Sequence, residues 1–426
     1  MGALSGQERL RRGDNMTDPR FWIWLQEALG IGSHKVDRVL RQFGSPEPLY
    51  QMDQEALLDT GIFTPKEAAN LRLVTLEHAQ KQVELAKRYG CRILTPDQAE
   101  FPENLTNMDG IPCVLYVLGD LSKLADRPSL CLVGTRRATS YGERTARDLS
   151  RELAAAGCAV VSGLAVGIDS AAHEGALEVE GYTIGLLACG MNVNYPMASA
   201  QLKRRILDGG GALVTEFPFG FHSSRYAFYT RNRLLSGISS GVVVIQAPES
   251  SGALITARYA LDQSRDVFAV PGEMGDESMK GCNRLIADGA VLVQNAESIL
   301  AEYRSRFPGL KQPGRREKWS IPADHLEQKR PKRALPAAKT VETSMLQVAQ
   351  EAPNPTTHQK PAQLEEIALT QTAKALYYTL EAAPLDCDQL VERTGLAVSE
   401  IMSALTELEL NDLAEMLPGG RFRIKA

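Results

Sequence analysis

The residues best suited to chemistry in this sequence are arginines, glycines and hydroxyl residues that stand together in three short clusters. The clusters are Gly134-Thr135-Arg136, Arg231-Asn232-Arg233 and Ser251-Gly252. A guanidinium group binds phosphate oxygens with paired hydrogen bonds, and glycine lets a ligand come close to the backbone amides. These residue types together predict a binding site for an anion, and phosphate is the anion that suits them best.

Five short apolar runs would position these clusters, and each run ends in glycine, proline or another small residue. The runs are 131–133, 159–161, 185–187, 242–245 and 267–270. Helical patterns separate them, and this alternation predicts a doubly wound parallel α/β sheet. Ligands of such sheets bind beyond the carboxyl ends of the strands. Ser162, Gly163 and Gly167 follow the second run, so we expect them to share one crevice with the three clusters.

Motifs for a bound cofactor or metal are missing from this region. The dinucleotide fingerprint G-x-G-x-x-G is absent, because residues 134–139 keep only its first glycine, and no P-loop occurs anywhere in the sequence. The seven cysteines stand singly without a C-x-x-C pair, and His173 has no second histidine nearby. We therefore expect no cofactor, no metal and no catalytic residue.

Six blocks of this sequence, in their order and approximate spacing, resemble the DNA-processing protein A (DprA/Smf) family. The blocks lie at 133–142, 161–177, 231–233, 251–257, 266–272 and 281–290. One such block would be a weak sign, whereas six in order are specific. The resemblance is strong over about residues 101–293 and looser in the N-terminal and C-terminal parts.

The resemblance implies a Rossmann-like fold that binds single-stranded DNA in a basic pocket and dimerises. It also implies protection of incoming DNA during natural transformation and help in loading the RecA recombinase. On this basis the residues expected to hold the DNA backbone, with weak sequence preference, are Gly134, Thr135, Arg136, Ser162, Gly163, Gly167, Arg231, Asn232, Arg233, Ser251 and Gly252.

Three positions depart from the pattern of that family. A basic residue is frequent where Val166 stands, Phe-Pro usually replaces Phe228-Tyr229, and Glu is common at Gln246. The charge missing at Val166 weakens the expected phosphate binding.

Neighbouring residues have structural as well as functional interpretations. Asp169 opens a helical run and is expected to cap it, and His173 suits packing or hydrogen bonding as well as ligand binding. Arg137 and Arg258 fit ordinary solvated charges. The aromatic residues that would either stack on bases or fill the core are Tyr141, Phe228 and Tyr229.

Two other functions compete with strand binding. One is an enzyme similar to the lysine-decarboxylase-like phosphoribohydrolases, but residues 271–276 lack most of their Pro-Gly-Gly-x-Gly-Thr-x-x-Glu motif. In that case Glu216 and Asp169 would be the acid and base. The other is a small-nucleotide sensor that uses the same crevice. Ligand length separates these functions, because a sensor saturates with one nucleotide and a strand binder tightens as the oligomer grows.

The chain as a whole divides into five expected parts. Residues 1–18 are expected to be a disordered leader, and residues 19–96 a helical domain with helix-hairpin-helix turns at Gly30-Ile31-Gly32 and Thr60-Gly61-Ile62. These turns suit either one phosphate contact or simple support. The DNA-binding sheet domain is expected at 97–304. A proline-rich linker with a basic cluster at 329–333 follows over 305–368.

Residues 369–426 show the order of a winged-helix domain. Its expected recognition helix, 399–410, carries Glu400, Glu407 and Glu409 and no lysine or arginine. Phosphate repulsion opposes the entry of an acidic helix into a DNA groove, so we expect this domain to contact protein or to regulate access more than it binds DNA.

Composition limits the remaining options. The formal charge is −5, so any affinity for nucleic acid must be local. No apolar run approaches the roughly 20 residues that a membrane-spanning helix needs, and no signal-peptide pattern follows the N-terminal arginines. We expect a cytoplasmic protein that does not enter the membrane.

Overall fold

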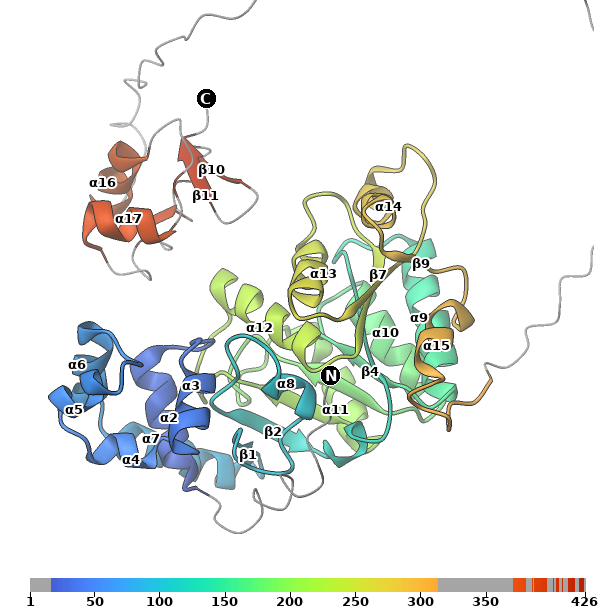
Figure 1. Ribbon diagram of the computed structural model, residues 1–426. Helices are drawn as coiled ribbons and strands as arrows, with labels where there is room; N and C mark the ends of the chain where they lie inside the picture. The colour runs from blue at the N-terminus through green and yellow to red at the C-terminus, as the bar shows by residue number, and fades with distance from the viewer. Residues whose placement is uncertain are drawn as a thin grey trace, which may run out of the picture. The chain divides into compact units, whose positions relative to one another are not determined.

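The computed structural model describes residues 17–312 and, further on, 371–380, 385, 387–396, 401, 404–405, 408, 413–417 and 421–424. The chain forms two compact units, Met1–Ala323 and Asp324–Ala426. Figure 1 shows the helices and strands of both. In the described part, no helix is both long enough and apolar enough to cross a membrane.

In the described residues, six helices form the N-terminal part of the first unit. They are α2 (Pro19–Leu29), α3 (Val36–Phe43), α4 (Glu47–Gln51), α5 (Gln54–Asp59), α6 (Pro65–Leu73) and α7 (Leu76–Arg88). The carboxylate of Asp18 accepts a hydrogen bond from the Arg20 amide and caps α2, so the last residue of the expected leader is ordered. Residues 1–16 of that leader lie outside the described residues.

The two expected helix hairpins are present and are fastened to each other. Lys35 Nζ donates to the Ile62 carbonyl at 2.7 Å, and Arg38 Nη2 donates to the Gly61 carbonyl at 2.7 Å. Cations of the first hairpin therefore satisfy carbonyl groups in the loop of the second. This arrangement favours a support role for the helical part.

A nine-stranded sheet forms the centre of the first unit. Its strands are β1 (Arg92–Leu94), β2 (Leu115–Gly119), β3 (Ser129–Gly134), β4 (Ala159–Ser162), β5 (Thr183–Leu186), β6 (Ala212–Thr215), β7 (Gly241–Gln246), β8 (Asp266–Ala269) and β9 (Val291–Leu292). The spatial order is β1-β2-β6-β5-β4-β3-β7-β8-β9. The strands β6-β5-β4-β3-β7-β8-β9 are parallel to one another. Beside β6, β2 and then β1 extend the sheet with antiparallel pairing.

This topology confirms the expected doubly wound, Rossmann-like fold. From β3 the chain moves outward through β4, β5 and β6, then crosses back to place β7 on the other side of β3. The reversal creates a switch point between the carboxyl ends of β3 and β7, where ligands of such sheets bind. The sheet begins at Arg92, somewhat before the expected domain start at residue 97.

Helices cover the sheet and connect its strands. They are α8 (Glu103–Thr106), α9 (Ser140–Ala155), α10 (Ile168–Leu177), α11 (Ala200–Asp208), α12 (Arg225–Gly237), α13 (Gly252–Asp262), α14 (Lys280–Ala287) and α15 (Glu297–Tyr303), with short 3₁₀ turns at Ser122–Leu124, Met197–Ser199 and Glu277–Met279. Residues 305–312 of the expected linker still belong to this unit, because the Lys311 amide donates to the Ala156 carbonyl. Residues 313–368 lie outside the described residues.

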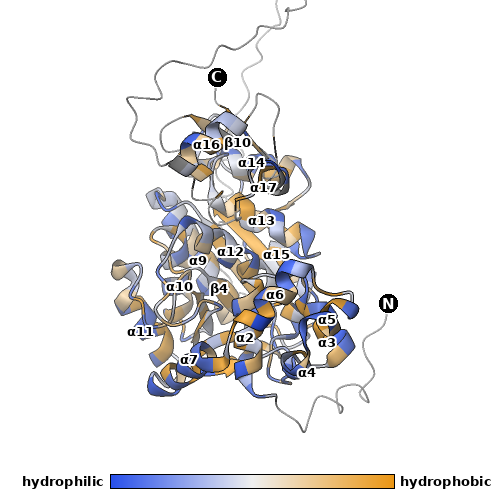
Figure 2. Cartoon of the chain, turned by 90° about the vertical axis from the view of Figure 1, so that its left-hand side faces the viewer, coloured by the Kyte–Doolittle hydropathy of each residue, from blue (hydrophilic) through white to orange (hydrophobic). Residues whose placement is uncertain are grey.

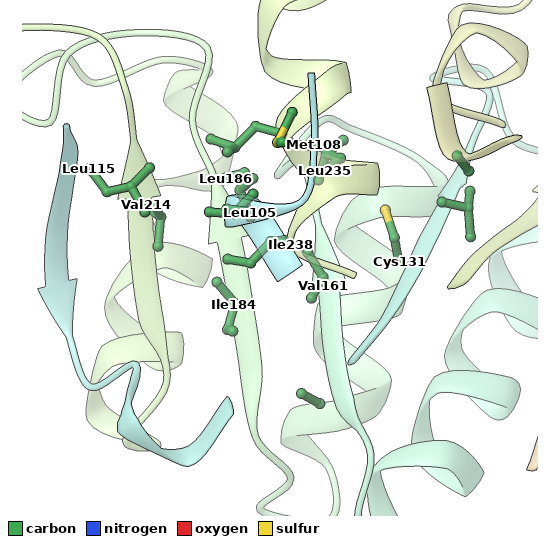
Figure 3. Close-up of a cluster of buried hydrophobic side chains, with 14 of the residues drawn as sticks. Leu105, Met108, Leu115, Cys131, Val161, Ile184, Leu186, Val214, Leu235 and Ile238 are labelled. Atoms are coloured by element: carbon green, nitrogen blue, oxygen red, sulfur yellow. The ribbon is translucent and has the colours of Figure 1, made fainter. Parts of the chain in front are cut away.

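One hydrophobic core joins the helical part to the sheet. It runs from Trp22 and Trp24 of α2 to the fully buried strands. Figure 3 shows Leu105, Met108, Leu235 and Ile238 in one cluster with side chains of the central strands, such as Val161, Ile184 and Leu186. The hydropathy colouring of Figure 2 shows mixed polar and apolar faces on the surrounding helices. The N-terminal helices and the sheet therefore share one core within one compact unit.

The second unit has its own small core. Its described elements are α16 (Gln371–Thr379), α17 (Cys387–Thr394), helical residues at 401, 404, 405 and 408, and the hairpin of β10 (Ala414–Leu417) and β11 (Arg421–Ile424). Leu376, Leu390, Leu405 and Phe422 are buried together. Helices followed by a β-hairpin confirm the winged-helix order. The three glutamates of the expected recognition helix lie outside the described residues.

Candidate functional site

A pocket of about 580 Å³ opens at the switch point of the sheet. The loop after β3 forms one wall, α12 a second, and the N-terminal turn of α13 a third. Asp169, from the first turn of α10, also lines the pocket. Of the expected site residues, the pocket brings together Gly134, Thr135, Arg136, Arg231, Asn232, Ser251 and Gly252.

Hydrogen bonds to Gln246 hold the loop after β3 in place. The Thr135 amide donates to the Gln246 carbonyl at 2.7 Å, and the Thr139 amide donates to Gln246 Oε1 at 2.9 Å. A Cβ on Gly134 would lie 2.7 Å from the Gln246 carbonyl oxygen, so this position needs glycine. Gln246, at the end of β7, therefore fixes the loop that carries Arg136.

Arg231 lies at the bottom of the pocket. It is only 4% exposed, and its Nε and Nη1 have no hydrogen-bond partner among the described residues. Its guanidinium lies directly over Gly163, where a Cβ would come within 1.4 Å of Nη1. Burial lowers the pKa of Arg231 and raises the pKa of Asp169, and the attraction between the two opposite charges counteracts both shifts.

The Phe228 ring of the pocket lining lies close to two guanidinium groups. The guanidinium carbon of Arg136 lies 4.4 Å from the centroid of the Phe228 ring, and that of Arg231 lies 5.8 Å from it. The Tyr195 ring meets Phe228 edge to face at 5.9 Å. Arg136 is exposed, so it offers its remaining donors to solvent or ligand.

The N-terminus of α13 faces the same space. Ser251 caps the helix by accepting a hydrogen bond from the Ala253 amide at 3.3 Å, and Asn232 Nδ2 donates to the Gly252 carbonyl at 3.4 Å. The partial positive charge at a helix N-terminus adds to the arginines. Cationic and dipolar groups from three separate elements thus converge on one pocket.

Comparison with known proteins identifies the family. Residues 92–304 match the family described as DNA recombination-mediator protein A, and residues 359–420 match the DprA winged helix domain. Protein Smf of Synechocystis is 31% identical over 419 residues, which cover 96% of this chain and 99% of that protein. The chain belongs to the DprA/Smf family.

Two further relatives agree with this DprA/Smf assignment. Protein Smf of Escherichia coli is 31% identical over 410 residues, covering 96% of this chain and 97% of that protein. The X-ray structure of DprA from Streptococcus pneumoniae matches with a TM-score of 0.58 and 28% identity, covering 68% of this chain and 99% of that one. The resemblance seen in the sequence is confirmed, and so is the fold that it implied.

Arg233 does not share the pocket that the DprA-type sequence blocks suggested for it. Its Nη2 pairs with Glu216 Oε1 at 2.5 Å, and its Nη1 donates to the Gly110 carbonyl at 2.5 Å. Gln26 of α2 donates to the Glu216 carbonyl. Residues two apart on a helix point roughly 200° away from each other, so Arg231 and Arg233 face different sides of α12. Arg233 therefore joins α12 to Glu216, which follows β6, and to the Gly110 carbonyl.

Ser162, Gly163 and Gly167 also lie outside the main pocket. The Ser162 hydroxyl donates to the Leu132 carbonyl at 2.6 Å between two buried strands. Gly167 has φ +83°, and a Cβ there would lie 2.7 Å from the Thr135 carbonyl oxygen, so its role is close packing. Gly163 borders a small adjoining cavity of about 60 Å³ with Val166, Tyr195 and Phe228.

The buried polar residues near the site differ in role. His173 is fully buried beside Thr183 Oγ1 at 2.7 Å, and burial lowers its pKa from 6.5 to about 3, so it is neutral. Glu216 is paired with Arg233 and does not line the pocket, so Glu216 and Asp169 do not form an acid and base pair there. Among the described residues, no group of three metal-binding side chains comes together.

Sequence reasoning missed two parts of the site. Asp169 was expected to cap α10 or, in an enzyme, to act as an acid or base, and it was not among the residues expected to bind DNA, yet it lines the pocket beside Arg231. Tyr195 was not expected near the site, because it lies between strands without a helical or strand pattern. Both positions depend on long-range packing, and no local sequence signal identifies them.

Proposed function

We propose that this chain binds single-stranded DNA in the switch-point pocket and holds the sugar-phosphate backbone there. The observation that carries the proposal is Arg231, a buried arginine at the bottom of the pocket whose Nε and Nη1 have no partner among the described residues. A buried donor without a partner is costly, so it marks a place where a ligand acceptor belongs. Phosphate oxygens suit a guanidinium because both can form paired, charge-assisted hydrogen bonds.

The Phe228 ring beside Arg136 and Arg231 favours binding of single strands over duplex DNA. Phe228 is half-buried at the junction of the main pocket and the small cavity, so part of its ring faces ligand. Only an unpaired base can turn its face toward such a ring. Stacking tolerates every base, so sequence preference is weak.

We infer that the pocket binds DNA without catalysing a reaction. Its lining includes one carboxylate, Asp169, whose charge is opposed by the nearby Arg231. Within the described part of the chain, no cysteine or histidine lines the pocket. The chemistry available there is recognition by charge, hydrogen bonding and stacking.

Membership of the DprA/Smf family supports a cellular role in handling DNA. Under this proposal the chain acts in the cytoplasm as a homodimer, protects incoming strands during natural transformation and helps to load the RecA recombinase. The winged-helix domain would contact protein partners. These statements extend the strand-binding proposal.

A small-nucleotide sensor is the second candidate, and the size of the pocket favours it. A cavity of about 580 Å³ falls in the range of roughly 300–1,000 Å³ that is typical of small-molecule sites. The pocket therefore holds a group about as large as one nucleotide. Ligand length distinguishes a sensor from a strand binder.

Fluorescence anisotropy with internally labelled oligothymidines of increasing length, and with matched duplex, tests the proposal. We expect single strands to bind more tightly than duplex and affinity to rise with length. In the Arg136→Ala/Arg231→Gln variant, the slope of the logarithm of the binding constant against the logarithm of the salt concentration becomes shallower by about 0.7 for each phosphate that the variant no longer neutralises. Arg258→Ala, an exposed arginine outside the pocket, is the matched control. Saturation by one nucleotide would favour the sensor, and equal binding by the double variant would refute the site.

A further inference from the structure

The lining of the pocket carries more positive than negative charge. Four arginines and one aspartate line the pocket as a whole, and Arg231 is the buried one of the four, with its Nε and Nη1 unpartnered among the described residues. The Arg136 and Arg231 guanidinium groups approach the same Phe228 ring. Two cations so close together repel each other, and Asp169 alone offsets them within the pocket lining. This balance favours a ligand group with more than one negative charge.

The shape of the site favours a phosphate group whose free oxygens point toward the bottom of the pocket. The pocket has the volume of a small-molecule site, whereas strand-binding proteins without sequence preference commonly use an extended groove. Arg231 is 4% exposed, so only an atom at the very bottom of the pocket can reach its donors. A phosphate that reaches them must be free on the side that leads into the pocket.

Internal and terminal phosphates differ in this respect. A phosphodiester inside a strand carries one charge, and a sugar is attached on each side. A phosphomonoester carries about −1.5 to −2 at neutral pH and has three free acceptor oxygens and only one sugar. The monoester matches both the charge and the depth of the site better.

We propose that the deep end of the switch-point pocket binds a phosphomonoester, either at the end of a DNA strand or on a free nucleotide, with Arg231 as its innermost ligand. The attached base then lies near Phe228 and Tyr195, which border the adjoining cavity. This inference rests on the proposed function, and it adds that strand ends occupy the pocket in preference to strand interiors.

The test uses the full-length protein and three internally labelled oligothymidines of one length. One ends in hydroxyl groups, one carries a 5′-phosphate and one a 3′-phosphate. We expect at least one phosphorylated strand to bind about tenfold more tightly than the hydroxyl-ended strand, which corresponds to about 1.4 kcal/mol. Competition with thymidine monophosphate, against thymidine as control, then identifies the source of the monoester. If thymidine monophosphate displaces the labelled strand but the three strands bind equally, the ligand is a free nucleotide. If a phosphorylated strand binds more tightly but the nucleotide does not displace it, the ligand is a strand end.

Variants tie the preference to the pocket. Arg231→Gln should abolish the phosphate preference, and Arg258→Ala should keep it, with thermal unfolding used to check that both variants are folded. The comparison of the three strands in the unaltered protein does not depend on any variant. Equal affinity for all three, together with no displacement by the nucleotide, would overturn this inference and leave strand binding intact. No binding of any strand would overturn the proposed function itself.

Discussion

Gly163→Ala is the substitution that follows most directly from the geometry of the site. A Cβ at this position would lie 1.4 Å from Arg231 Nη1 and 2.4 Å from its Cζ. Gly163 has no positive φ, so alanine suits its backbone. The added methyl group and the guanidinium cannot occupy the same space, and Arg231 must move away from the bottom of the pocket.

The size of the effect can be estimated from the hydrogen bond that a displaced Arg231 would no longer donate to phosphate. A hydrogen bond to a charged group contributes about 1.5–3 kcal/mol, and each 1.4 kcal/mol is a factor of ten in the dissociation constant. Displacement of Arg231 should therefore weaken single-strand binding roughly 10- to 100-fold. The crowding itself should cost about 1–3 kcal/mol of folding stability, as is usual for overpacked sites.

The assay is fluorescence anisotropy with oligothymidine across a salt series, accompanied by urea unfolding. Gly309→Ala is the matched control, because a Cβ there meets nothing within 4 Å and the residue lies outside the pocket. If Gly163→Ala is folded and binds with unchanged affinity and salt dependence, Arg231 is not a DNA ligand and the reasoning is refuted.

Three further predictions follow from the described contacts. Phe228→Ala should weaken strand binding by about 1–3 kcal/mol without changing the salt dependence, because stacking is removed and no charge is; a shallower salt slope in the same titration would contradict this. Arg233→Ala should destabilise the protein by about 3–5 kcal/mol in urea unfolding, since it leaves Glu216 buried and unpaired. Wild-type stability would show that the buried Arg233–Glu216 pair is not needed. His173 has a folded pKa of about 3 against 6.5 unfolded, so its contribution to stability is complete above about pH 6.5 and is lost as the pH falls toward 3, at up to roughly 1.4 kcal/mol per pH unit. His173→Gln should flatten this pH dependence of the free energy of unfolding between about pH 5 and 7. An unchanged slope would show that the imidazole is not responsible.

The sequence was most informative where strands end. Glycines and small residues after apolar runs predicted the parallel sheet, the switch point and the place of Gly134, Arg136, Ser251 and Gly252, because these features arise from local patterns and from the general geometry of parallel sheets. The antiparallel strands β1 and β2 carry no comparable signal. They are short, and their pairing depends on the rest of the sheet.

The site showed both the value and the limits of local reasoning. The spacing of Arg231 and Arg233 on one helix already implies opposite faces, so their separation was predictable. The partner of Arg233 was not, since Glu216 follows a different strand. Asp169 and Tyr195 reach the pocket region only through the packing of α10 and of the segment before α11.

The most direct test of the central claim is an experimental structure of the chain with a bound oligothymidine. The account predicts a phosphate oxygen about 2.7–2.9 Å from Nε or Nη1 of Arg231, with a base against the Phe228 ring. A strand bound elsewhere on the protein, with Arg231 out of reach of any phosphate, would contradict it.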